Sequence, residues 1–151
     1  MTVVPSPLGS LWAKCDDQAI LALSFRPLSL PLLESGSHPL TQSLYSWLND
    51  YFSKRFQVPI SFPLRPEGTE FQKRVWAGVA GIAAGRVATY GDLARQLKTS
   101  PRAVGQALGA NPIPIVIPCH RIVAVGGRIG GYSGGEGEGT KRWLLCWEGI
   151  D

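Results

Sequence analysis

The sequence has few cysteines, and their spacing is not typical of disulfide-bonded or zinc-binding proteins. The three cysteines, Cys15, Cys119 and Cys146, show no CxxC spacing. An odd, sparse set disfavours a disulfide framework or a structural zinc site and favours a reducing compartment. Cys15 and His38 could contribute to a metal site, but two ligands are too few to hold an ion. We therefore expect neither a metal nor any other cofactor.

Long apolar runs are also absent. No stretch approaches the roughly 18 apolar residues that a membrane-spanning helix requires. Residues 1–7 lack a basic segment followed by an apolar one, so we expect no secretory signal. With 44% hydrophobic and 17% charged residues, the 151-residue chain has enough apolar side chains for a core. These features predict a cytoplasmic globular protein, monomeric in solution and without a membrane partner.

Acidic residues are nearly missing from one long stretch. Between residues 71 and 130 Asp92 is the only acid, whereas eight residues are basic, which gives a net charge of +7. The rest of the chain carries −3, so the total of +4 hides a strong asymmetry. A basic region of this kind fits a polyanionic partner such as DNA. A solvated basic face without a partner fits the charge equally well.

Residues 1–65 predict a small α/β lobe. Apolar runs at 10–13 and 19–25 flank a polar Asp-Asp-Gln turn, which indicates a β-hairpin. A helix face is predicted by apolar residues at helical spacing, namely Leu44, Trp47, Leu48, Tyr51 and Phe52. Residues 58–62 suggest a further strand, and the proline-containing segment 63–68 is the expected linker.

Residues 66–151 predict a mostly helical second lobe. Thr69 and Gln72 form a capping box, and the helix that follows is expected to end near Gly85. Two short helices come next, one beginning after Thr89 and one running from Pro101 to Gly109 behind a Ser100 cap. Two short helices joined by a tight polar turn are typical of a helix-turn-helix.

The second helix of this pair carries unusually small side chains. Only Arg102 and Gln106 have the polar groups that read base edges in a major groove. Small residues such as Ala103 let a backbone approach a surface closely, which favours phosphate and minor-groove contacts. We expect Ser100, Arg102, Ala103 and Gln106 to contact DNA. The alternative is a helix packed tightly inside the protein.

The strongest chemical signal is a cysteine followed by a histidine and an arginine. Residues 115–117 predict a short core strand, so Cys119 is expected where that strand meets a proline turn. Positive charge nearby lowers the pKa of a thiol, and His120 could take its proton directly or through a water. Glu148, which follows a predicted helix over residues 140–147, is a candidate to orient the imidazole.

A glycine-rich loop over residues 126–135 follows the cysteine. It lacks the GxxxxGK[ST] pattern and no strand–GxGxxG–helix unit surrounds it, so phosphate binding is not indicated. We interpret it as a mobile pocket wall, with Tyr132 and Ser133 as its functional groups.

Four motifs together resemble the O6-alkylguanine-DNA alkyltransferase family. They are Arg102-Ala-Val-Gly, Asn111-Pro-x-Pro, Ile117-Pro-Cys-His-Arg-Ile-Val123 and Gly131-Tyr-Ser-Gly-Gly135. The resemblance runs from about residue 69 to 149; before it, only the order of elements and Ser6-Pro-Leu-Gly9 match. It implies an α+β fold, in which a ribonuclease H-like lobe with an antiparallel sheet precedes the helix-turn-helix lobe.

The resemblance implies direct DNA repair. Cys119 would accept the alkyl group from O6 of guanine in duplex DNA, in a single self-inactivating turnover without a cofactor. His120 would act on it through a water, with Glu148 orienting the imidazole. Asn111 would brace the segment as a hinge residue, and Tyr90 would help rotate the nucleotide and protonate the leaving guanine.

The same resemblance implies the DNA and substrate contacts. Arg102 would fill the gap that the flipped base leaves in the duplex. Tyr132 and Ser133 would line the pocket together with Pro114. The backbone carbonyls of Cys119 and Ile122 would meet the exocyclic amine of guanine.

Residues 136–140 are more acidic and richer in glycine than the family pattern, and the zinc ligands of some relatives are missing here. Three rival interpretations remain. A non-catalytic lesion binder would replace the reactive cysteine, whereas Cys119 is intact. A helix-turn-helix regulator leaves the Pro-Cys-His-Arg run unexplained. A Cys-His hydrolase would need an oxyanion-hole element and a separate histidine, and neither is evident.

Overall fold

The computed structural model describes residues 2–27, 38–132, 134–135 and 137–150. Contacts divide the chain into two compact units, Met1–Glu67 and Gly68–Asp151. Their boundary falls inside the expected linker, two residues after the predicted limit at residue 65. The chain contains both helices and strands, with one small antiparallel sheet, which agrees with the predicted α+β class. The predicted pocket residue Ser133 and the unusual Glu136 lie outside the described residues.

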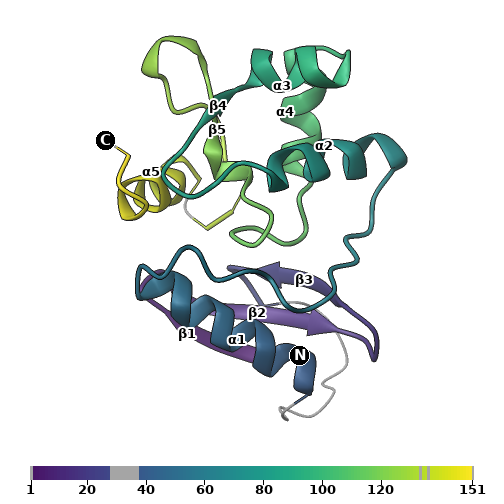
Figure 1. Ribbon diagram of the computed structural model, residues 1–151, viewed down its shortest axis with the longest axis vertical. Coiled ribbons are helices and arrows are strands. Elements are labelled where there is room, and N and C mark those ends of the chain that lie inside the picture. Colours follow the sequence, from purple (N-terminus) through teal and green to yellow (C-terminus); the bar gives the residue numbers. More distant parts are fainter. Residues whose placement is uncertain (1, 28–37, 133, 136, 151) are drawn as a thin grey trace. The chain divides into compact units, whose positions relative to one another are not determined.

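The first unit begins with an antiparallel sheet in the order β1-β2-β3, drawn in purple in Figure 1. Its strands are β1 (Thr2–Ser6), β2 (Gly9–Cys15) and β3 (Ile20–Ser24). The predicted hairpin is confirmed: Asp16 Oδ1 accepts the backbone N–H groups of Gln18 (2.8 Å) and Ala19 (2.9 Å) and so shapes the turn. The sequence did not predict β1, an edge strand where a proline is tolerated.

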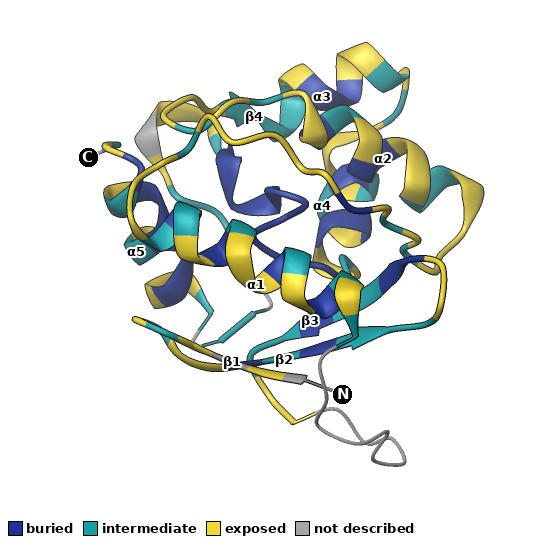
Figure 2. Ribbon diagram, turned by 60° about the horizontal axis from the view of Figure 1, so that its bottom comes forward, coloured by how far each residue is buried: buried dark blue, intermediate teal, exposed yellow. Residues whose placement is uncertain are grey.

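Helix α1 (Pro39–Phe52) packs against β2 through its apolar face. Leu44, Leu48 and Tyr51 are buried, which confirms the predicted helix face (Figure 2). The strand suggested for residues 58–62 is wrong. Only Leu64 forms a bridge with Ile20, because the prolines of this segment have no N–H to donate to a ladder.

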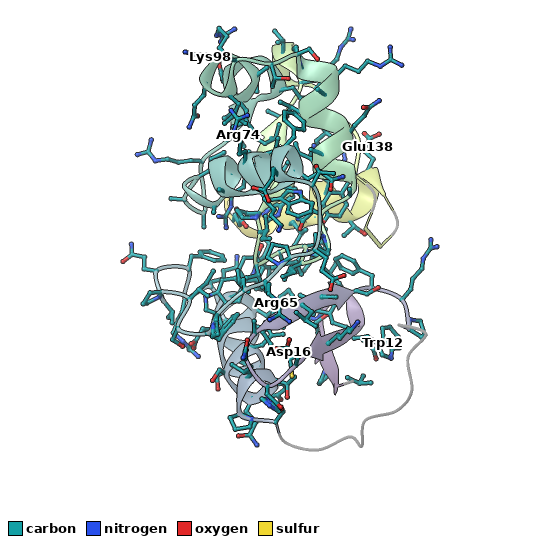
Figure 3. All side chains as sticks on the ribbon, turned by 90° about the vertical axis from the view of Figure 1, so that its right-hand side faces the viewer. Trp12, Asp16, Arg65, Arg74, Lys98 and Glu138 are labelled. Atoms are coloured by element: carbon teal, nitrogen blue, oxygen red, sulfur yellow. The ribbon has the colours of Figure 1, made fainter. Side chains whose placement is uncertain are left out.

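Backbone hydrogen bonds and one ion pair hold the end of this unit to its hairpin. Ile20 donates its N–H to the Pro63 carbonyl (2.9 Å), and Arg65 donates its own N–H to the Ile20 carbonyl (2.9 Å). The Arg65 guanidinium also pairs with Asp16 in the hairpin turn, as Figure 3 shows from the side. The chain is therefore fixed on the sheet immediately before it enters the linker.

Four α-helices lie in the described part of the second unit. They are α2 (Glu70–Ala80), α3 (Tyr90–Leu97), α4 (Pro101–Gly109) and α5 (Glu138–Trp147). Three of them start at the predicted caps, whereas α5 starts at Glu138, two residues before the predicted start at residue 140. Thr69 forms its capping box with Gln72, and Thr89 forms a second one with Asp92. Ser100 Oγ accepts the N–H of Ala103 (3.1 Å) at the start of α4. Each cap satisfies N–H groups that a helix leaves without a partner.

Helix α2 ends at Ala80 and not near Gly85, which corrects the prediction. Ile82 donates its N–H to the Val79 carbonyl (3.0 Å) in a tight turn that leaves the helix. The Ile82 carbonyl then accepts a hydrogen bond from Arg121 (2.7 Å). A continued helix would use that carbonyl for its own ladder, so the earlier end frees it for the site.

Helices α2, α3 and α4 enclose the core of the second unit (Figure 1). Between α3 and α4 the chain turns at Lys98, which has a left-handed backbone (φ 57°), while Arg74 caps the Leu97 carbonyl (3.1 Å). A two-residue parallel pairing joins β4 (Ala88–Thr89) to β5 (Ile122–Val123). The core consists of Val75, Val79, Leu93, Ala94, Val104, Ala107, Leu108, Cys119 and Ile122. It thus places the predicted nucleophile against α2–α4.

Candidate active site

The segment before the cysteine is a braced turn. Residues 115–117 do not form the predicted core strand, and Ile115 has a left-handed backbone (φ 72°). Prolines at three positions of this segment remove the N–H donors that a strand ladder would need. The Asn111 side chain forms hydrogen bonds to the backbone of the segment instead. Its Nδ2 donates to the Ile117 carbonyl (2.9 Å), and its Oδ1 accepts the Ile113 N–H (3.0 Å). Asn111 therefore fixes the backbone that leads into the site.

Cys119 opens a 3-10 turn, Cys119–Arg121, that leads into β5. The residue is 8% exposed, and burial raises the pKa of its thiol. A hydrogen bond from the Asn111 side chain and the charge of Lys141 lower that pKa in part. The thiol is neutral at rest, so a nucleophilic role requires a base.

His120 lies fully inside the protein, at 0% exposure. Its Nε2 is 2.7 Å from Glu148 Oε2. Burial lowers the pKa of His120, although contact with Glu148 opposes the shift. A neutral imidazole that donates from Nε2 leaves a lone pair on Nδ1. Nδ1 is buried and has no hydrogen-bond partner among the described residues, so it can accept a proton.

Glu148 follows the last turn of α5, where Arg121 holds both of its oxygens. Arg121 Nε is 2.8 Å from Oε1, and Nη2 is 3.0 Å from Oε2. Burial alone would raise the pKa of Glu148, but the hydrogen bonds from His120 and Arg121 outweigh it and lower the pKa to about 2. The carboxylate therefore stays ionised beside His120 and orients the ring.

Cys119 lies on the wall of a cavity of about 410 Å³. The lining residues are Tyr90, Pro101, Gly105, Leu108, Gly109, Cys119, Gly131 and Tyr132. Burial raises the pKa of both tyrosine hydroxyls, and the Tyr132 hydroxyl has no hydrogen-bond partner in the described ranges. A largely apolar cavity with few polar groups beside a thiol fits a small organic group.

Sequence reasoning missed Lys141, which is 1% exposed. Its Nζ donates to the Gly131 carbonyl (3.1 Å) and to Tyr90 Oη (3.3 Å), and burial lowers its pKa to about 8. A signal was present, because Lys141 shares the buried face of α5 with Leu144, Leu145 and Glu148 at helical spacing. A lysine on that face is either paired or functional.

The other predicted residues are distributed between surface and core. Arg102 and Gln106 are exposed on α4, Ala103 is half-buried, and Ser100 serves as the cap. Pro114 and Ile122 are buried and do not line the cavity. Arg121 is buried and forms an ion pair with Glu148. The other basic residues of 71–130 are all exposed.

The described part of the chain contains neither a cluster of metal ligands nor a membrane-spanning helix. Within it, no three histidine, cysteine or acidic side chains come close enough to hold a metal ion. No helix in the same ranges is long and apolar enough to cross a membrane.

Comparison with known proteins places this site in a family. Residues 70–150 match the family described as "6-O-methylguanine DNA methyltransferase, DNA binding domain". The methylated-DNA–protein-cysteine methyltransferase of Salmonella typhimurium is 39% identical over 97% of this chain and 94% of its own length. Its counterpart from Metallosphaera sedula is 39% identical over 95% and 89%, respectively.

A solved structure agrees with these relatives. The Mycobacterium tuberculosis OGT in complex with DNA superimposes with a TM-score of 0.85 and 32% sequence identity. The match covers 97% of this chain and 91% of that one. Matching residues thus span both units and include the buried Cys119, His120 and Glu148. The chain belongs to the methylated-DNA–protein-cysteine methyltransferase family.

Proposed function

We propose that this protein repairs O6-alkylguanine in duplex DNA by moving the alkyl group onto its own Cys119. One observation carries the proposal: a buried thiol opens on a cavity and is followed in the chain by a neutral histidine that an ionised glutamate orients. Family membership supports the substrate class, and the basic surface of residues 71–130 supports DNA as the partner.

The transfer begins with proton removal from Cys119. His120 Nδ1 takes the proton through a water, since side chains of adjacent residues point apart. The thiolate then attacks the alkyl carbon, a C–S bond forms, and the C–O bond breaks with its electron pair going to guanine. Tyr90 donates a proton to the leaving base, and Lys141 at 3.3 Å stabilises the phenolate that remains. The phenolate then takes a proton from solvent. The protonated His120 releases its proton to solvent and becomes neutral again.

Glu148 and Arg121 act as positioning residues in this scheme. The pKa of Glu148, about 2, prevents it from taking the proton of the imidazole at neutral pH. Its oxygens instead fix the Nε2–H tautomer, which keeps the lone pair on Nδ1. Asn111 holds the preceding turn and donates to the thiolate, which favours the charged nucleophile.

The buried site requires that the base leave the DNA stack. A thiol that is 8% exposed cannot reach an atom inside a duplex, so the nucleotide must rotate into the cavity. Pro101 lines the cavity, and the adjacent Arg102 is exposed. Arg102 would enter the base stack and offset part of the cost of unstacking.

Helices α3 and α4 form the proposed helix-turn-helix and bind the minor groove. Support comes from the small side chains of α4, since Ala103 and Gly105 leave little to hold its backbone away from DNA. The first unit, with three antiparallel strands followed by a helix, is proposed to be ribonuclease H-like.

The reaction is proposed to stop after one turnover, because a thioether has no tendency to release its alkyl group. Within the second unit, Cys146 is exposed on α5 and does not line the cavity, so it is not placed to accept the group from Cys119. The test is the amount of methyl transferred from excess O6-methylguanine duplex. We expect one equivalent for the wild type and the matched control Cys146→Ser, and none for Cys119→Ser. Continued turnover, or activity in Cys119→Ser, would refute the proposal.

A further inference from the structure

Helix α2 supplies hydrogen-bond donors to the carboxyl ends of the next two helices. Arg74 Nη2 donates to the carbonyl of Leu97, the last residue of α3 (3.1 Å). Trp76 Nε1 donates to the carbonyl of Ala107 in the last turn of α4 (2.8 Å). The last four carbonyls of a helix lack a partner within the helix, so they accept such donors. Two side chains of α2 thus hold both helices of the proposed helix-turn-helix.

The hydrogen bond to α4 is the better protected of the two. Trp76 is 2% exposed, whereas Arg74 is exposed to water, which competes for its guanidinium. A buried carbonyl that loses its donor has no water to replace it. The indole has a single N–H, and its direction is fixed by the plane of the ring. Trp76 therefore determines where the end of α4 lies.

The Trp76 ring is itself packed against the backbone before α2. A Cβ atom added to Gly68 would lie 2.5 Å from Cη2 and 2.8 Å from Cζ3 of this ring. Gly68 does not have a positive φ, so close approach to the ring requires glycine here, and backbone conformation does not. The ring has little room to turn away from α4.

Helix α4 depends on such a fixed point because its packing surface is short and smooth. Its nine residues pack through Val104, Ala107 and Leu108, and α2 lies beside it (Figure 1). Small side chains interdigitate little, so packing alone resists rotation of this helix weakly. Arg102 lies five residues before Ala107, roughly 7.5 Å along the helix axis. A small rotation or tilt at the carboxyl end therefore displaces the Arg102 side chain.

We propose that Trp76 is a positioning residue for repair in duplex DNA. Its indole N–H fixes the rotation and tilt of α4, so that Arg102 is directed at the base stack. This role rests on the proposed function, because Arg102 acts only when a nucleotide leaves a duplex. Trp76 takes no part in the bond changes at Cys119 and acts through α4 alone.

The test is a double-mutant cycle in the full-length protein. Rate constants for methyl transfer from an O6-methylguanine duplex are measured for the wild type, Trp76→Phe, Arg102→Ala and the double variant. Phenylalanine keeps an aromatic ring in the core but has no N–H to donate. Trp47→Phe is the matched control, because Trp47 Nε1 also donates to a backbone carbonyl, that of Val58 in the first unit (3.2 Å).

Trp76→Phe should slow transfer from the duplex about three- to tenfold, which corresponds to the loss of one hydrogen bond. In the Arg102→Ala background the same change should slow transfer by less than about twofold, because the side chain that it displaces is gone. Transfer from free O6-methylguanine, which needs no plug in a base stack, should also change by less than about twofold. The Trp47→Phe control should repair the duplex at the wild-type rate. An equal loss in both Arg102 backgrounds, as a purely structural role predicts, or an unchanged duplex rate would overturn the inference.

Gly68→Ala tests the same contact without removing the indole. Its Cβ would displace the Trp76 ring, and it would also lie 2.6 Å from Gln72 Oε1, the end of a flexible side chain that can move away. We expect slower repair in duplex and little further loss when Arg102 is alanine. Gly81→Ala is the matched control at the other end of α2, since its Cβ meets only a backbone oxygen at 4.0 Å. Urea unfolding verifies that each variant is folded at the assay temperature.

Two further outcomes separate this inference from the proposed function. If Arg102→Ala slows repair in duplex but Trp76→Phe does not, only the role of Trp76 is contradicted. If Arg102→Ala repairs the duplex at the wild-type rate, the plug in the proposed function is contradicted, and the role of Trp76 falls with it.

Discussion

Replacement of Glu148 by glutamine should destabilise the protein strongly and slow alkyl transfer. The carboxylate accepts hydrogen bonds from His120 Nε2 and from two nitrogens of Arg121. Glutamine has one oxygen and one NH₂ group, so at least one of these donors would face another donor. If the NH₂ group faces His120, the ring must accept at Nε2 and carry its proton on Nδ1. The lone pair that serves as the base is then lost.

The expected magnitude follows from the shifted pKa of Glu148. Contacts in the folded protein lower this pKa from the ordinary 4.5 to about 2. A gap of about 2.5 units corresponds to about 3 kcal/mol of preference for the ionised form. Glutamine resembles the neutral acid and forfeits that preference. Loss of one partner from a buried ion pair costs about 3–5 kcal/mol in other proteins, which is the same order.

Urea unfolding of the full chain at neutral pH measures this loss. Glu148→Gln should lower the free energy of unfolding by about 3 kcal/mol, or the melting temperature by roughly 6–12 °C. Glu138→Gln is the matched control, because Glu138, labelled in Figure 3, lies on α5. It pairs with Arg142 in an exposed contact. The control should change stability by less than about 0.5 kcal/mol. Equal stability of the two variants would refute the reasoning.

Three further predictions concern pH, the DNA contact and salt. Because the pKa of folded Glu148 lies near 2, its contribution is complete above pH 4.5 and is lost as the pH falls toward 2; wild type should therefore lose about 3 kcal/mol more than Glu148→Gln in urea titrations over this range. Arg102→Ala should slow repair in duplex with little loss toward the free alkylated base in rate assays, and equal losses would exclude its role as a plug. Affinity for DNA should fall linearly with ionic strength on logarithmic axes in a binding titration, and salt-independent binding would contradict phosphate contact by the basic surface.

The starts of α2, α3 and α4 were predictable from sequence because capping is local. Thr69 with Gln72 and Thr89 with Asp92 satisfy each other within three residues, and Ser100 does the same for α4. The end of α2 was not predictable in this way, because it depends on a hydrogen bond between Ile82 and a residue far along the chain.

The structure of the turn at residues 115–117 also escaped prediction. Three apolar residues in a row resemble a buried strand, and hydrophobic periodicity cannot distinguish such a strand from a buried turn. The neighbouring prolines remove ladder donors, and the Asn111 side chain closes the turn from outside the run. The β4–β5 pairing was missed for a related reason, since it joins short segments more than 30 residues apart.

The candidate site was predictable where its residues are adjacent or few. Cys119 and His120 are neighbours in the chain, and Glu148 is one of only seven acidic residues in the lobe predicted for residues 66–151. The hydrogen bonds from Arg121 to both Glu148 oxygens depend on tertiary packing. The burial of Lys141 beside Tyr90 depends on it as well. Sequence reasoning identifies groups that carry chemistry, whereas the groups that adjust their pKa emerge only from the folded contacts.

The central claim is that Cys119 receives the alkyl group, and mass spectrometry tests it most directly. The full-length protein is incubated with a duplex that contains O6-methylguanine, and its intact mass and peptides are then measured. The account predicts a gain of one methyl group in place of a hydrogen, located on the peptide that carries Cys119 and absent from those with Cys15 or Cys146. An unchanged mass with retained DNA binding, or a methyl group on another residue, would contradict it.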